Sequence, residues 1–98
     1  MKIEKFTEGD ELRLSLSGCL DTAASADFDT ALKESIDAKT LVIDFTGLEF
    51  IASSGLRSLV AANKRAVAEG RAIVLSGMND VIRDVFDVTG LMDIFTVR

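Results

Sequence analysis

The chain has 98 residues, close to the usual size of one small domain, and 48% of them are hydrophobic, which is enough to build a core. Its net charge of −5 argues against general affinity for nucleic acid or for anionic membranes, because both need a basic surface. It has no His and one Cys, so it lacks the residues of a Ser-His-Asp or Cys-His catalytic device, of a structural zinc site and of an internal disulfide.

These exclusions predict a protein that is not an enzyme and needs no cofactor. No window of the sequence approaches 18 apolar residues, and the first residues lack the apolar segment of a signal peptide, so we expect no membrane insertion. A single Cys suits a reducing cytoplasm, which is the location we expect. That residue, Cys19, follows Gly18 at the end of a predicted strand and is expected to be a small core residue.

The first elements are two strands joined by a short turn. Residues 2–6 and 11–17 alternate between polar and apolar side chains, which is typical of strands with one buried face. Residues 7–10, Thr-Glu-Gly-Asp, have the composition of a turn, so the two strands are predicted to form a hairpin that ends at Gly18.

A helix is predicted over residues 22–36, with Asp21 or Thr22 as its cap. Its apolar residues recur at intervals of four, at Phe28, Leu32 and Ile36. The nearly continuous apolar run over residues 41–45 predicts a strand covered on both faces, and Thr46-Gly47 is predicted to turn the chain.

The main helix is predicted over residues 53–69, with Gly70 as its C-terminal stop. Its apolar face is predicted to contain Leu56, Leu59, Val60, Asn63 and Val67. Residues 72–75 are predicted to form a buried strand.

A helix capped by Asn79 or Asp80 carries Ile82, Val85 and Phe86, and residues 91–97 close the chain with a turn and a strand. The order β-β-α-β-α-β-α-β predicts one α/β domain spanning residues 1–98, with a mixed sheet, an N-terminal hairpin and amphipathic helices packed against it.

Three segments together resemble a known family. They are residues 14–21 (LSLSGCLD), residues 41–59 (LVIDFTGLEFIASSGLRSL) and residues 81–97 (VIRDVFDVTGLMDIFTV). Their order and spacing resemble those of the STAS domain in its stand-alone anti-sigma factor antagonist form, and the resemblance covers essentially the whole chain.

The resemblance implies a function and a modification site. In that family, the loop motif is usually Asp-Ser-Ser-Gly-Leu or Asp-Ser-Thr-Gly-Leu. The Ser directly after the Asp is phosphorylated by a partner serine kinase that is itself an anti-sigma factor. The corresponding residue here is Ser53, and Ala52 occupies the position of the Asp. The resemblance therefore implies that the unphosphorylated chain binds an anti-sigma factor kinase and releases a sigma factor. It also implies that phosphorylation at Ser53 reverses this and that a phosphatase acting on phospho-Ser53 resets the cycle.

The residues themselves leave two interpretations of Ser53 open. A Ser before Gly-Leu at a helix start is most often an N-cap, worth about 1 kcal/mol. The same position presents unpaired amides and the positive end of the helix dipole, where a phosphate is tolerated. Ser54 is a weaker alternative phosphorylation site.

No acidic residue lies between Phe50 and Asn63, which suggests a surface for binding a partner. This surface would consist of the exposed edges of Phe50, Ile51 and Leu56, rimmed by Ser and Arg57. An equally favoured alternative is that these residues belong to a solvated helix face with no partner. Asp21 is expected either to contact the partner or to cap the first helix, and Gly55 to let the backbone pass closely. The predicted partner-binding residues are Asp21, Phe50, Ile51, Ser53, Ser54, Gly55, Leu56 and Arg57.

Two other classes of function compete with this hypothesis. A passive scaffold or transporter-accessory STAS module would use the same surface without phosphorylation, and Ala52 favours it. A small-ligand or nucleotide binder at the same helix N-terminus is less favoured, because the chain has neither a Gly-x-Gly-x-x-Gly nor a Walker-type loop.

Overall fold

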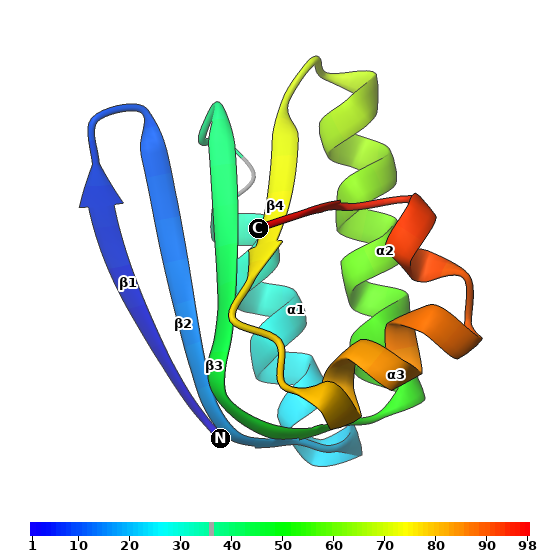
Figure 1. Ribbon diagram of the computed structural model, residues 1–98. Coiled ribbons are helices and arrows are strands. Elements are labelled where there is room, and N and C mark those ends of the chain that lie inside the picture. The colour runs from blue at the N-terminus through cyan, green and yellow to red at the C-terminus, as the bar shows by residue number, and fades with distance from the viewer. Residues whose placement is uncertain (36) are drawn as a thin grey trace.

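The computed structural model describes residues 1–35 and 37–98 of the chain (Figure 1). Its elements follow the predicted order and are β1 (Lys2–Glu8), β2 (Glu11–Leu20), α1 (Thr22–Ser35), β3 (Thr40–Ile51), α2 (Ser53–Ala68), β4 (Ala72–Ser76), α3 (Asp80–Val88), a 3-10 turn (Leu91–Asp93) and β5 (Thr96–Val97). Ile36, predicted as part of the first helix, lies outside the described residues.

The strands form one mixed sheet in the order β1-β2-β3-β4-β5. β1 and β2 pair antiparallel as the predicted hairpin, and the pairs β2-β3, β3-β4 and β4-β5 are all parallel. The parallel pairing follows from the helices that connect these strands, since each crossover returns the chain to the same end of the sheet.

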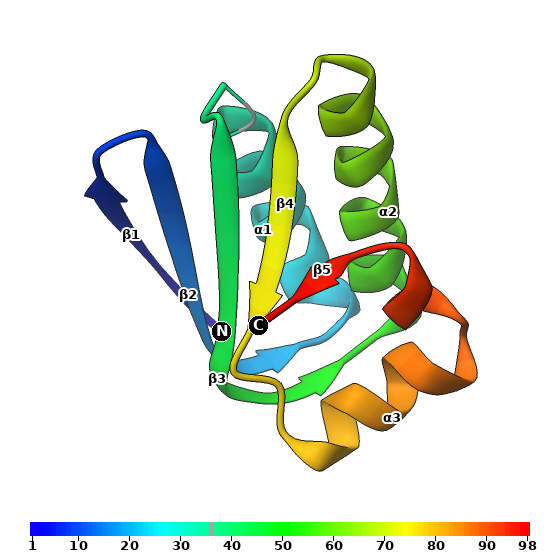
Figure 2. The same cartoon turned by 45° about the horizontal axis from the view of Figure 1, so that its top comes forward.

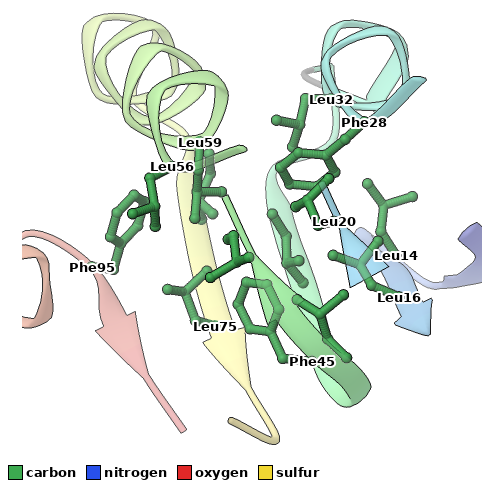
Figure 3. Close-up of a cluster of buried hydrophobic side chains, with 14 of the residues drawn as sticks. Leu14, Leu16, Leu20, Phe28, Leu32, Phe45, Leu56, Leu59, Leu75 and Phe95 are labelled. Carbon is green, nitrogen blue, oxygen red and sulfur yellow. The ribbon is translucent and has the colours of Figure 1, made fainter. Parts of the chain in front are cut away.

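The core lies between the sheet and the two long helices, which cover the same face (Figures 2 and 3). Leu14 and Leu16 of β2 point toward Phe28 and Leu32 of α1 (Figure 3). At the other side, Phe86 of α3 lies between two further rings, with ring centroids 5.9 Å from Phe45 and 6.2 Å from Phe95. The shorter helix α3 is thereby tied to the same core.

The predicted turn at Thr46-Gly47 is wrong, because β3 continues without interruption to Ile51. Gly47 pairs with Ser17 of β2 next to a register shift, and a Cβ atom on Gly47 would lie 2.9 Å from the Ser17 Cβ. The glycine therefore permits a close approach of two strands rather than a reversal of the chain. As a consequence, β2 and β3 end together, with Leu20 opposite Ile51.

Two burial predictions are also wrong. Val67 is 66% exposed, and Ala66 takes its place in the core. Successive residues of an α-helix are rotated by about 100° around its axis. Since Leu59 and Ala66 face the core, Val67 is turned toward solvent. Cys19 is exposed rather than part of the core, because side chains alternate along β2 and its neighbour Leu20 points inward.

We expect Phe86→Ala to lower the free energy of unfolding by about 3–5 kcal/mol, because it removes a fully buried ring from the aromatic cluster. Val88→Ala on the same helix is the matched control, since that side chain is 88% exposed and its loss should change stability by less than about 0.5 kcal/mol. Urea unfolding of the two variants measures the difference. Equal effects would contradict this assignment of the core face of α3.

Candidate functional site

Two strand-to-helix connections lie side by side at the carboxyl edge of the sheet. A single residue links β2 to α1 and a single residue links β3 to α2, namely Asp21 and Ala52. The Ala52 amide donates a hydrogen bond of 2.8 Å to the Leu20 carbonyl. The N-termini of α1 and α2 are therefore neighbours.

Asp21 caps α1, which confirms the structural interpretation of this residue. Its Oδ1 accepts a 2.8 Å hydrogen bond from the Ala24 amide. Its carbonyl accepts from the Ser25 amide at 3.0 Å. The first turn of α1 therefore has the acceptor that a helix N-terminus needs.

The N-terminus of α2 lacks the corresponding side-chain cap. Ala52 occupies the N-cap position in extended conformation (φ −84°, ψ 162°) and makes no side-chain hydrogen bond to the first turn of the helix. The interpretation of Ser53 as the N-cap is therefore wrong, because Ser53 is already the first helical residue. The first turn also contains no acidic residue, so α2 itself supplies no carboxylate to the positive end of its dipole.

The hydroxyls of Ser53 and Ser54 differ in exposure and in hydrogen bonding. Ser54 Oγ lies 2.7 Å from Ser25 Oγ. Ser25 already donates its only hydroxyl proton to the Asp21 carbonyl at 2.8 Å, so Ser54 is the donor in this pair. Ser54 thus bonds to α1, whereas Ser53 is exposed.

Ser25 is a site residue that the sequence did not identify. It is a buried serine in the first turn of α1, 29 positions before Ser54. A Ser at this point of a helix gives no sign of a distant partner, because only the packing of α1 against α2 brings the two hydroxyls together.

Gly55 allows the backbone of α2 to pass close to β2, as predicted. A Cβ atom on Gly55 would lie 2.9 Å from both Cγ and Cδ2 of Leu20. With any larger residue, either the Leu20 side chain or the start of α2 would have to shift. The glycine therefore sets the spacing between the two connections.

The predicted contact patch is only partly exposed. Phe50 is 49% exposed, and Arg57 and Ser53 are exposed as well. The prediction of exposed edges is wrong for Ile51 and Leu56, which are 5% and 9% exposed. Both belong to the core cluster, because each faces the interior where β3 ends and α2 begins.

A groove along α2 is a further feature that the sequence did not reveal. It has a volume of about 430 Å³ and runs from Ser53 past Arg57 to Lys64. Leu91, from the segment after α3, closes its other side together with Thr89. The groove was missed because residues more than 20 positions after the end of α2 complete it.

Neither a membrane-spanning helix nor a metal-ligand cluster is found in residues 1–35 and 37–98. None of the helices there has both the length and the apolar character needed to cross a membrane. No three or more His, Cys, Asp or Glu side chains gather there in a way that could hold a metal ion.

The exposed chemistry at this edge of the sheet is that of a hydroxyl beside a helix N-terminus. The Ser53 hydroxyl can accept a phosphoryl group, and the resulting phosphate would lie where the helix dipole favours negative charge. The nearby Phe50 and Arg57 supply an apolar and a cationic contact. Such an arrangement can both bind a partner and change its charge on modification.

Comparisons with known proteins agree with this fold. A family model described as "Mlab, STAS domain" matches residues 4–96. A curated relative named "Putative anti-sigma factor antagonist BtrV", from Bordetella bronchiseptica, is 27% identical over 84 residues, which are 84% of this chain and 72% of that protein.

Two solved structures share the fold at lower identity. An anti-sigma factor antagonist from Mycobacterium paratuberculosis superposes with a TM-score of 0.90 at 21% identity, covering 98% of this chain and 83% of that one. The Bacillus cell fate determinant SpoIIAA, in its phosphorylated form, superposes with a TM-score of 0.78 at 20% identity, covering 99% of this chain and 91% of that one.

We expect Ala52→Asp to raise the free energy of unfolding at pH 7 by about 1 kcal/mol, because the new carboxylate can accept from the uncapped amides of α2. Ala52→Asn should give a similar gain, since it caps without charge, and Ala52→Leu should give none. Urea unfolding of the three variants provides the measurement. If Ala52→Asp and Ala52→Asn raise the free energy of unfolding no more than Ala52→Leu does, the first turn of α2 does not lack a cap.

Proposed function

Because the chain belongs to the STAS domain family, we propose that it is an anti-sigma factor antagonist that changes partners through phosphorylation of Ser53. The observation that carries this proposal is the exposed Ser53 hydroxyl at the first residue of α2, beside the neighbouring helix N-terminus at Asp21. Ser54 is a poorer acceptor of a phosphoryl group, because its proton is engaged with Ser25.

In the proposed cycle, the unmodified chain binds an anti-sigma factor serine kinase, and the sigma factor is released. The kinase then transfers the γ-phosphoryl group of ATP to Ser53 Oγ: the new O–P bond forms, the bond to ADP breaks, and the hydroxyl proton is lost. A phosphatase hydrolyses the phosphoester and restores the hydroxyl. The chain is a substrate in this cycle rather than an enzyme, and it acts in the cytoplasm.

Two of the similar proteins support this proposal, one by its name and the other by its phosphorylated form. BtrV is named as a putative anti-sigma factor antagonist and aligns with most of this chain. SpoIIAA has been solved in a phosphorylated form, so a domain with this fold can carry a phosphate.

One phosphate is sufficient to act as a switch. It adds about −1.5 to −2 charges at pH 7. A hundredfold loss of affinity needs only about 2.8 kcal/mol, and placing a charge in a docked, desolvated surface can cost several kcal/mol. The domain itself can remain folded, because a phosphate at the start of α2 is compatible with the helix dipole.

A second candidate function is a non-phosphorylated scaffold or transporter-accessory interaction module. Ala52 favours it, because this residue leaves the loop without the carboxylate that the family motif places before the Ser. Such a module would keep its partner whether or not Ser53 carries negative charge. Retained stoichiometric binding by Ser53→Asp would support it.

We expect incubation with ATP and the kinase encoded beside this gene to add a single phosphate that maps to Ser53. Intact-mass spectrometry with site mapping measures it. The phosphate should be absent in Ser53→Ala and present in the matched control Ser54→Ala, because only the Ser53 hydroxyl is exposed and free of the bond to Ser25. The phosphorylated chain should bind the kinase about a hundredfold more weakly than the unmodified chain.

The same experiment separates the two candidates. A kinase that binds the chain and hydrolyses ATP, yet leaves Ser53 unmodified, would refute the phosphorylation cycle and support the scaffold. A phosphate on Ser54 alone would refute the assignment of the site and leave the cycle standing.

A further inference from the structure

The groove along α2, defined here as the α2 groove, has an apolar floor and a cationic rim. Leu56 and Val60 of α2 and Leu91 after α3 form the floor, and Arg57 and Lys64 stand on the rim. Within the described part of the chain, no carboxylate lines this groove, although the chain carries sixteen acidic residues. The groove is therefore cationic, although the negative net charge of the chain would suggest an acidic surface.

The two rim cations also differ from those of the neighbouring groove between α1 and α2. There, Lys33 pairs with Asp29 at 2.9 Å, and Arg65 pairs with Glu69 at 3.9 Å. Among the described residues, Arg57 and Lys64 take part in no ion pair. Their charges are thus available to a partner.

The length of the groove suits a helix of about three turns. It follows one stripe of α2, with Ser53 at one end and Lys64 at the other, a span of about 16 Å at about 1.5 Å per residue. That is about three helical turns, the length over which an amphipathic helix inserts its apolar side chains into a groove. The rim cations are seven positions apart, so carboxylates on a partner helix would match them at a similar spacing.

We propose that the α2 groove binds an amphipathic helix of the partner whose polar edge carries one carboxylate facing Arg57 and one facing Lys64. Since the groove begins at Ser53, this inference rests on the proposed function and names the chemistry of its partner. Charge complementarity selects an acidic helix over a basic one, and the apolar floor anchors it.

The same geometry explains how a phosphate would displace that helix. Ser53 and Arg57 are four positions apart on α2, so they lie on the same face, where a phosphate can pair with the guanidinium. Arg57 is then no longer available to the partner, and the phosphate repels the partner's carboxylates. Phosphorylation thereby acts on one end of the groove without unfolding α2.

A display selection tests the groove without any kinase. The full chain is used to select from a library of helical peptides with fixed apolar positions at i, i+3, i+4 and i+7 and random residues elsewhere. We expect Asp and Glu to be enriched at two positions about seven residues apart. The selected peptide should bind the Arg57→Gln/Lys64→Gln variant about tenfold more weakly.

Arg83→Gln is the matched control. Arg83 is an exposed cation of α3 that lies outside the groove lining and in the described residues forms no ion pair, so its loss should leave peptide affinity unchanged. Circular dichroism of each variant checks that the fold is retained. Amide shifts on peptide binding should centre on Val60 and Leu91.

Several outcomes would overturn the inference. They are the recovery of no peptide, the absence of acidic enrichment, equal binding to the double variant, and amide shifts elsewhere on the surface. Self-association of the chain, abolished by Arg57→Gln/Lys64→Gln, would assign the groove to a second copy instead.

Binding of the adjacent kinase separates this inference from the proposed function. If the kinase binds the wild-type chain and the double variant equally, and Ser53 is phosphorylated, the proposed function stands and the groove inference fails. If acidic helices bind the groove but the kinase neither binds nor modifies the chain, the groove inference stands and the proposed function fails.

Discussion

The hydrogen bond from the Ala52 amide to the Leu20 carbonyl is the constraint on which the candidate site depends. It joins the ends of two parallel strands, and each strand enters a helix after a single residue. Gly55 makes the arrangement possible, because a side chain there would collide with Leu20. The two helix N-termini are therefore held at a set distance, and the Ser25–Ser54 bond ties them together from within.

These two adjacent helix ends differ in one functional respect. Asp21 satisfies the first turn of α1 and supplies negative charge beside its dipole, whereas Ala52 supplies neither to α2. The start of α2 therefore has neither a side-chain cap nor an acidic residue in its first turn, and it carries an exposed hydroxyl. Within residues 1–35 and 37–98, the cations of the α2 groove form no ion pair. In the proposed function, this surface attracts acidic groups of a partner before modification and loses that attraction once a phosphate occupies Ser53.

Much of the fold could be predicted from local patterns. The alternation in β1 and β2, the apolar run of β3 and the spacing of apolar residues in the helices predicted the order of the elements, and the structure confirms that order. Asn79 was correctly named as a possible cap of α3, and its side chain accepts from Ile82 at 2.9 Å. Gly47 misled the prediction, because a glycine that permits close strand approach looks the same in sequence as one that turns the chain.

The sequence by itself determined the residue types at the site: a Ser-Ser-Gly-Leu start of α2, an Ala in place of a capping acid, and no acidic residue from Phe50 to Asn63. Tertiary structure alone decided which of these groups are accessible. It buried Ile51 and Leu56, bonded Ser54 to Ser25, left Ser53 exposed and completed the α2 groove with Leu91. Local periodicity reports which face of an element is apolar. Exposure and hydrogen-bond partners depend on contacts between residues far apart in the chain, which only the packing of the helices on the sheet creates.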